Sequence, residues 1–304
     1  MLNVKIKDIK FNNPLLTASG TFGYGDEVKS LTDLSKLGGI VTKSVTLEPR
    51  EGNPPPRIYE TTSGMLNSIG LANVGINTYC EQKLPFLNSL DTKIIINIAG
   101  SSLDEYVKVL EKLEESNGVH VGYEINISCP NVKKGGMQFG VDCSMTEQLT
   151  KRLREKTDKL LIMKLSPNVT SIQEIAKASE NGGADAVSAI NTLVGAGIDI
   201  NTRKPVLNTT FGGLSGPAIK PIAIANILKI SKVVSIPIIG IGGISNYKDV
   251  IEFILAGATM IQLGTINFSQ PHRNEEILIQ LKNWLNKNNI SQIMDLKGAV
   301  ECYS

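Results

Sequence analysis

The chain has 304 residues, of which 41% are hydrophobic and 20% charged, and its formal net charge is +2. This length suits a single α/β barrel domain, and the near-neutral charge, without a dense Lys/Arg stripe, gives no reason to expect nucleic acid as a partner. The N-terminal segment lacks the apolar core of a signal peptide, and no apolar run reaches membrane-spanning length. We therefore expect a cytoplasmic protein.

The four cysteines are too dispersed to form a metal-binding cluster. Cys80, Cys129, Cys143 and Cys302 contain no CxxC spacing, so neither a zinc ribbon nor an iron–sulfur site within this chain is expected. In a reducing compartment they should be free thiols.

Short apolar runs alternate with longer amphipathic segments along the chain, and no linker divides it. Strands are expected at Leu15–Ser19, Ile40–Ser44, Ile94–Ala99, Gly122–Ser128, Leu160–Leu165, Ala186–Asn191, Ile236–Gly240 and Met260–Gly264. Apolar stripes at helical spacing predict helices at Leu103–Glu115, Ser171–Asn181, Asn246–Ala256 and Asn274–Asn286. Eight mostly buried strands separated by helices predict one (β/α)8 TIM-barrel domain over residues 1–304, with an open doubly wound sheet as the alternative.

In a barrel, functional residues gather at the carboxyl ends of the strands. Polar residues stand at these ends in the sequence: Ser19, Lys43, Ser44, Asn97, Asn126, Ser128, Lys164, Asn191 and Thr192. A lysine that closes an apolar strand is unexpected, because a buried cation is costly without a partner. One such lysine could belong to a structural salt bridge, but two, with a ring of Asn and Ser, predict a polar ligand in the barrel mouth.

Glycines close the last two predicted strands, in IIGIGGI (Ile238–Ile244) and IQLGT (Ile261–Thr265). In barrels the loops after strands seven and eight often form a phosphate cradle, where glycines let backbone N–H groups approach the oxygens. Tight turns without a ligand are the alternative. We favour the phosphate site.

Four asparagines could recognise a planar ring that carries an imide, because a carboxamide offers both a donor and an acceptor. They are Asn67, Asn97, Asn126 and Asn191. Each could instead be a turn or cap residue, but Asn126 and Asn191 close apolar strands. Asn67 opens the loop Asn67–Leu71, in which Gly70 could let the backbone approach a ligand.

Cys129 follows a strand end and precedes Pro130, in a loop that also contains Gly135 and Gly136. A buried structural thiol is the common state of a free cysteine, but this position favours a reactive one. A nucleophilic cysteine normally has a histidine beside it, and neither His120 nor His272 is well placed in the sequence. We therefore expect Cys129 to act as a base, and both histidines to lie on the surface.

Long motifs then match one family in order along the chain. They are NPLLTASGTFGYG (Asn13–Gly25), GGIVTKSVTLEPREGNPPPR (Gly38–Arg57), GMLNSIGLAN (Gly64–Asn73), NISCPNVKKGG (Asn126–Gly136), KLSPNVT (Lys164–Thr170), INTLVGAGID (Ile190–Asp199), GGLSGPAIKP (Gly212–Pro221), GIGGI and LGT. On these motifs the chain resembles the catalytic subunits of class 1 dihydroorotate dehydrogenases, flavin enzymes of pyrimidine synthesis. The resemblance implies a barrel that holds FMN across its mouth, with dihydroorotate stacked on the flavin.

The resemblance also implies roles for individual residues. Flavin ring and ribityl contacts would come from Ser19, Lys43, Ser44, Asn97, Asn126, Lys164 and Ile190. The phosphate end would be enclosed by Gly216, Gly242, Gly243, Gly264 and Thr265. The substrate would be held by Lys43, Asn67, Ser68, Ile69, Gly70, Leu71, Asn126, Asn191 and Thr192.

The implied reaction oxidises (S)-dihydroorotate to orotate by removing a proton from C5 and a hydride from C6, which passes to flavin N5. Cys129 would be the general base that takes the proton. Lys164 would stabilise negative charge near N1 and O2 of the reduced flavin, and Lys43 would pair with the substrate carboxylate.

Two segments, Glu48–Arg57 and Glu60–Leu71, resemble the NAD-linked class 1B enzymes. There, a homodimer of catalytic chains joins two subunits that carry FAD and a 2Fe–2S cluster, in a heterotetramer. The fumarate-dependent class 1A homodimer is the alternative. The sequence departs from the family motif at Val141–Met145 and at Ala196–Gly197, which concerns loop detail and substrate fit.

Three other functions compete with this interpretation. A flavin-free, phosphate-binding barrel lyase could form a Schiff base at Lys43 or Lys164. A related flavin barrel could act on uracil-like rings or tRNA, although the near-neutral charge disfavours tRNA. A pure binding module would have little need for two strand-end lysines and a loop cysteine.

Overall fold

The computed structural model describes residues 1–128 and 139–301. Eight parallel strands close into a barrel in the order β10-β15-β16-β3-β4-β7-β8-β9. They are β3 (Leu15–Thr17), β4 (Gly39–Val41), β7 (Lys93–Ile98), β8 (Gly122–Asn126), β9 (Leu160–Leu165), β10 (Ala186–Ala189), β15 (Ile238–Ile241) and β16 (Met260–Leu263). All eight predicted strands are confirmed, and the closed barrel excludes the open doubly wound sheet. Strand β15 starts after Pro237, which has no N–H for the ladder.

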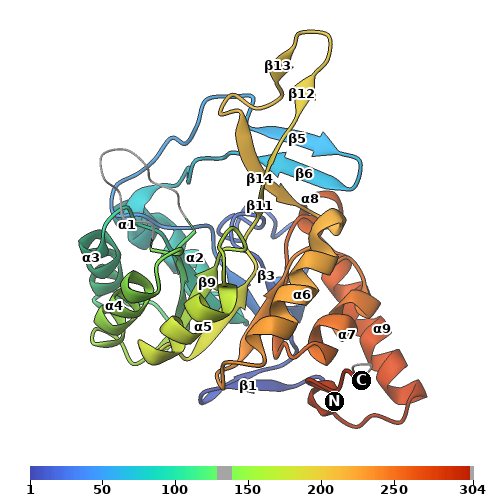
Figure 1. Ribbon diagram of the computed structural model, residues 1–304. Coiled ribbons are helices and arrows are strands. Elements are labelled where there is room, and N and C mark those ends of the chain that lie inside the picture. Colours follow the sequence, from blue (N-terminus) through green and yellow to red (C-terminus); the bar gives the residue numbers. More distant parts are fainter. Residues whose placement is uncertain (129–138, 302–304) are drawn as a thin grey trace.

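Helices surround the barrel (Figure 1). The longer ones are α3 (Leu103–Glu114), α4 (Cys143–Arg154), α5 (Ile172–Asn181), α6 (Lys220–Ile230), α7 (Tyr247–Leu255) and α9 (Arg273–Lys287), and the shorter ones are α1 (Gly75–Thr78), α2 (Leu84–Asn88) and α8 (Ile266–Ser269). Side-chain caps start four of them, at Ser102 before α3, Asp142 before α4, Ser171 before α5 and Asn246 before α7. No helix in the described part of the chain is both long and apolar enough to span a bilayer.

An antiparallel sheet that the sequence did not predict stands at one end of the barrel (Figure 1). Its strands β11 (Leu193–Ala196), β14 (Phe211–Ser215), β6 (Gly64–Asn67) and β5 (Ile58–Thr61) come from the loops that follow β4 and β10. The hairpin of β12 (Ile198–Asp199) and β13 (Lys204–Pro205) projects beyond it. Because these loops leave the carboxyl ends of barrel strands, the sheet stands beside the barrel mouth.

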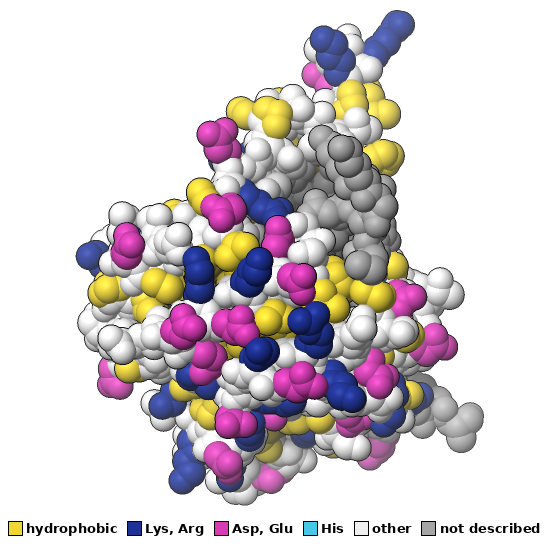
Figure 2. Space-filling view, turned by 90° about the vertical axis from the view of Figure 1, so that its left-hand side faces the viewer, with side chains coloured by type: hydrophobic (Ala, Val, Ile, Leu, Met, Phe, Trp, Pro, Cys, Tyr) yellow, Lys and Arg dark blue, Asp and Glu magenta, His cyan; other side chains and the backbone are white. Residues whose placement is uncertain are grey.

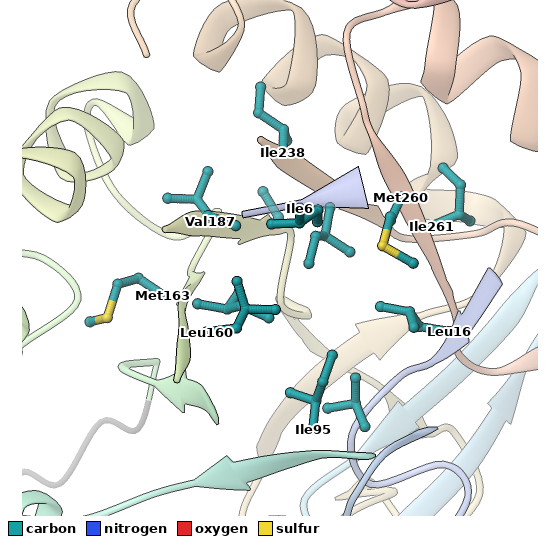
Figure 3. Packing of buried hydrophobic residues seen from close by; sticks show 14 of the residues in the cluster. Ile6, Leu16, Ile95, Leu160, Met163, Val187, Ile238, Met260 and Ile261 are labelled. Carbon is teal, nitrogen blue, oxygen red and sulfur yellow. The ribbon is translucent and has the colours of Figure 1, made fainter. Parts of the chain in front are cut away.

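The opposite end of the barrel is closed by the hairpin of β1 (Val4–Ile6) and β2 (Ile9–Phe11). Figure 3 shows Ile6 among buried apolar side chains from the barrel strands, including Leu16, Ile95, Leu160 and Val187. Each such side chain contributes about 1.5–3 kcal/mol when it is fully buried. The interior at this level is therefore packed core, which leaves the mouth as the place for a ligand.

Positive and negative side chains alternate on the outer face that includes α3 and α4. Figure 2 shows Lys and Arg interspersed with Asp and Glu there, with no area of a single sign. Several of these charges form ion pairs, such as Arg152 with Asp104 and Lys156 with Glu111. This face therefore has no strong field of one sign.

Candidate active site

A buried glutamate organises the polar side chains near the mouth. Glu124 lies in the middle of β8 with no exposed surface. Its Oε1 accepts a 2.7 Å hydrogen bond from the Asn97 amide, and its Oε2 accepts bonds from Ser188 (2.8 Å) and Gln262 (2.5 Å). These donors stand on β7, β10 and β16, so the carboxylate joins strands on different sides of the barrel. Burial of a carboxylate requires such donors.

Lys164 supplies the matching positive charge. Its Nζ lies 3.5 Å from Glu124 Oε1 and donates a 2.8 Å hydrogen bond to the Ser19 hydroxyl, and the residue is 4% exposed. On the other side of Glu124, the Ser44 hydroxyl donates to Asn97 Oδ1 at 2.5 Å. We call the connected set the rim network: Ser19, Ser44, Asn97, Glu124, Lys164, Ser188 and Gln262. The sequence allowed a structural salt bridge for one of the two strand-end lysines, and the structure has this salt bridge at Lys164.

Lys43 is in a different electrostatic situation. It follows β4, is half-buried, and its backbone N–H donates to the Gly23 carbonyl at 2.9 Å. Burial lowers the pKa of the Lys43 ammonium, Arg57 lowers it further, and Glu27 raises it. Within residues 1–128 and 139–301, no salt bridge engages this ammonium. A partly desolvated cation of this kind favours an anionic ligand.

Two of the predicted asparagines are in direct contact. The Asn191 amide donates to Asn126 Oδ1 at 3.2 Å, and the Asn191 side chain accepts from the Thr192 N–H at 2.8 Å. The Asn67 amide donates to the Gly213 carbonyl at 3.3 Å, and Gly213 adjoins Thr192 so closely that a Cβ there would lie 2.1 Å from the Thr192 hydroxyl. Contacts between the barrel strands and the added sheet therefore bring Asn67, Asn126, Asn191 and Thr192 together.

The remainder of the predicted substrate loop is partly exposed beside Asn67. Ser68, Ile69 and Leu71 are partly exposed and Gly70 is exposed. Gly70 has φ +75, and a Cβ at this position would lie 2.6 Å from the Asn53 backbone nitrogen. Glycine is therefore required here for the packing of two loops.

The glycines predicted to hold a phosphate form a close backbone cradle. A Cβ on Gly243 (φ +71) would lie 2.8 Å from both the Gly216 carbonyl oxygen and the Lys220 nitrogen. A Cβ on Gly264 would meet only the Ala18 Cβ, at 3.7 Å, so this glycine faces free space. Gly242 (φ +127) lies beside Gly243, and the Thr265 hydroxyl donates to Ser215 Oγ at 2.8 Å. Gly242, Gly243, Gly264 and Thr265 are partly exposed, and backbone and hydroxyl groups at such a place suit a phosphate.

Two other predicted positions stand apart from these contacts. Ile190 is 2% exposed, directly after β10, and its N–H donates to the Ile241 carbonyl at 3.0 Å. Cys129 and residues 130–138 lie outside the described residues. Asn126 and Ser128, which precede Cys129, are described, and the Asn126 carbonyl accepts a 2.6 Å bond from the Tyr106 hydroxyl.

The surface position predicted for His120 is wrong. His120 is 3% exposed, and its Nε2 lies 2.7 Å from the Tyr123 hydroxyl, which donates in turn to Glu114 Oε1 at 2.7 Å. The pKa of His120 is lowered to about 4, chiefly by burial and also by nearby Lys159, while Glu114 opposes the shift. His120 precedes β8 at the amino end of the barrel, where its ring packs against Tyr123. His272 is exposed as expected.

Sequence reasoning did not single out Glu124, Ser188, Gln262 or Ser215. In a fully buried strand each polar residue looks like one interruption among apolar neighbours, because contacts across the barrel are invisible in the sequence. A useful signal was present, since Glu124 and Gln262 each stand in the middle of an apolar strand. A buried polar residue needs a partner, so two on different strands predict a shared network.

Comparison of the sequence with known proteins identifies the family of this chain. The dihydroorotate dehydrogenase family model matches residues 1–285. Relatives named dihydroorotate dehydrogenase B (NAD(+)), catalytic subunit, include those of Geotalea daltonii (50% identity over 300 residues; 99% of this chain and 98% of the relative) and Desulforamulus reducens (51% over 298 residues; 98% of each). The Thermoanaerobacter pseudethanolicus relative is 49% identical over 300 residues, 99% of each chain. With this match over most of its length and its closed barrel, the chain belongs to the dihydroorotate dehydrogenase family.

Proposed function

We propose that this protein is the catalytic subunit of an NAD(+)-linked dihydroorotate dehydrogenase, which oxidises (S)-dihydroorotate to orotate in pyrimidine (UMP) biosynthesis. The observation that carries the proposal is about 50% identity, over nearly the whole chain, to relatives of that name. We propose that residues 1–304 act as one domain, since the added sheet is built from loops of the barrel. A cytoplasmic location suits the free thiols of Cys80 and Cys143.

FMN is the cofactor that the residues at the mouth fit. Its phosphate requires backbone donors with room for oxygens: the open space beside Gly264 would give the room, and the backbone of Gly216, Gly242 and Gly243 would supply donors. Bound FMN supplies the acceptor for the hydride from C6 of the substrate. Lys164 and Ser19 would hold the polar edge of the ring, and Ser44, Asn97, Asn126 and Ile190 would complete its surroundings.

The substrate is a dihydropyrimidine ring with amide groups and one carboxylate. Lys43 would pair with the carboxylate, because its half-buried ammonium has no salt bridge to the described residues. Asn67, Asn126, Asn191 and Thr192 would pair with the ring amides, since they converge beside the barrel mouth. Ser68–Leu71 would line the same side.

Cys129 would be the general base that takes the proton from C5. A cysteine with an ordinary pKa near 8.5 has a small thiolate fraction at neutral pH, which can accept a proton. This assignment rests on the sequence motif around Cys129. The buried His120 lies at the amino end of the barrel and takes no part.

Electrons would leave this chain through a second subunit. We propose a homodimer of this chain with two partners that carry FAD and a 2Fe–2S cluster and reduce NAD⁺. The fumarate-dependent class 1A arrangement is the competing assignment within the family. A Schiff base at Lys164 is less suitable, because its ammonium is already held by Glu124 and Ser19.

An absorbance spectrum of the purified protein, followed by anaerobic addition of dihydroorotate, tests the proposal. We expect flavin bands near a 1:1 ratio to protein, which bleach on addition of dihydroorotate. A colourless preparation that FMN does not reconstitute, or a flavin that dihydroorotate leaves oxidised, would refute the function. Rapid turnover with fumarate, without a partner, would assign the chain to class 1A instead.

A further inference from the structure

The rim network contains a negative charge that the reaction outlined above does not use. Glu124 is completely buried, yet none of the roles assigned to the substrate, the flavin or the proton falls on it. A buried carboxylate is costly to maintain unless it is paired and hydrogen-bonded. An apolar residue in the middle of β8 would avoid this cost, so the presence of Glu124 there needs an explanation.

The partners of Glu124 hold the carboxylate in one place. Asn97, Ser188 and Gln262 donate to it from three other strands, at 2.5 to 2.8 Å. These short bonds leave its two oxygens little freedom. The carboxylate is therefore held in a fixed position inside the barrel, below the mouth.

The Glu124 carboxylate in turn holds the ammonium of Lys164. Its Nζ has two partners among the described residues, Glu124 Oε1 at 3.5 Å and the Ser19 hydroxyl at 2.8 Å. A lysine side chain has four rotatable bonds, and this pair of contacts selects one orientation of them. At 3.5 Å the carboxylate also cancels part of the field of the ammonium, and the low dielectric of the interior makes this effect large.

We propose that Glu124 is a positioning residue that fixes the Lys164 ammonium at the flavin site and offsets part of the electric field of that ammonium. Glu124 would thereby set how readily the bound flavin is reduced. This inference rests on the proposed function, because it needs FMN beside Lys164. Neutralising Glu124 leaves the ammonium uncompensated, which favours the reduced, more negative flavin. The midpoint potential of the bound FMN should therefore rise.

The test measures the midpoint potential and dissociation constant of FMN in Glu124→Gln and Glu124→Asp. Glu114→Gln is the matched control, because Glu114 forms a carboxylate–lysine pair with Lys159 (2.8 Å) at the amino end of the barrel. Glu124→Gln should raise the ratio of reduced to oxidised flavin at a fixed potential at least tenfold, about 30 mV for a two-electron couple. Glu124→Asp keeps the charge, but its side chain is one methylene shorter, so the carboxylate lies farther from the Lys164 ammonium. It should shift the potential in the same direction by a smaller amount. Glu114→Gln should leave it unchanged.

A second substitution shows whether Glu124 acts through Lys164. In a Lys164→Gln background, Glu124→Gln can act on the flavin only through the direct loss of its own charge, so its effect on the potential should be clearly smaller than in the wild-type background. An equal shift with and without Lys164, or a wild-type potential in Glu124→Gln, overturns the inference. If Glu124→Gln does not fold, a wild-type potential in Glu124→Asp overturns it. A wild-type protein without reducible flavin would instead refute the proposed function, independently of these variants.

Discussion

The buried histidine makes a quantitative prediction about stability and pH. His120 Nε2 contacts the Tyr123 hydroxyl, and because that hydroxyl donates to Glu114, the ring nitrogen must be the donor to it. The other nitrogen, Nδ1, is buried and has no hydrogen-bond partner among the described residues. Protonation would therefore place a charged N–H where the described residues offer no acceptor.

The size of the effect follows from the two pKa values of the ring. The folded protein lowers the pKa from 6.5 to about 4, so below pH 6.5 the unfolded chain binds a proton that the folded chain does not. Stability is therefore lost as the pH falls from about 6.5 towards about 4, and the loss levels off below that. The full difference corresponds to about 3 kcal/mol, of which about 2 kcal/mol is already lost at about pH 5.

Urea unfolding of wild type and His120→Gln at pH 7.5 and pH 5.0 measures this loss. Glutamine does not titrate, while all other titratable groups are common to both proteins, so the difference between their pH dependences isolates His120. We expect wild type to lose about 2 kcal/mol more than the variant on acidification. Equal losses would refute the reasoning. NMR offers a direct check, since the chain has only two histidines and His272→Gln assigns their signals.

The remaining predictions concern the active site. Cys129→Ala should slow dihydroorotate oxidation by roughly 10²–10⁴-fold in stopped-flow flavin reduction while FMN stays bound, and Cys129→Ser should retain some rate with an optimum at higher pH; an unchanged alanine variant would disprove the base assignment. Lys43→Met should raise the dissociation constant of orotate roughly tenfold or more in a flavin-spectral titration, because a charged hydrogen bond is lost, and unchanged binding would place the carboxylate elsewhere. Gly243→Ala should weaken FMN binding by about tenfold in ultrafiltration, because alanine is strained at φ +71 and its Cβ would meet the Gly216 carbonyl; full flavin content would argue against the cradle. The isolated chain should reduce NAD⁺ poorly until an FAD/2Fe–2S partner is added, and brisk unaided reduction would exclude that partner.

The barrel was predictable because its signal is local. Each strand is a short apolar run between polar turns, and each stripe of a helix such as α3 or α9 repeats within a few residues. The strand-end residues were predictable for the same reason, since Lys164 and Asn126 interrupt apolar runs where strands end. Long motifs then allowed the family to be identified, and the family model and relatives confirm it.

The sheet beside the mouth could not be predicted in the same way. Strands such as β14 contain two glycines and are only partly buried, so they lack the alternation that indicates a strand. Their pairing joins segments about 150 residues apart, as when Asn67 pairs with Gly213. Only the folded chain brings this loop to Thr192.

By itself, the sequence determined the kind of barrel and the presence of polar residues where several of its strands end, because both are written in runs of neighbouring residues. Tertiary structure alone decided the environment of each group. Lys43 and Lys164 look alike in the sequence, yet only Lys164 meets a buried carboxylate, and His120 is inside because Tyr123 and Glu114 enclose it. Charge and protonation depend on burial and on partners from distant strands, and these exist only once the barrel has closed.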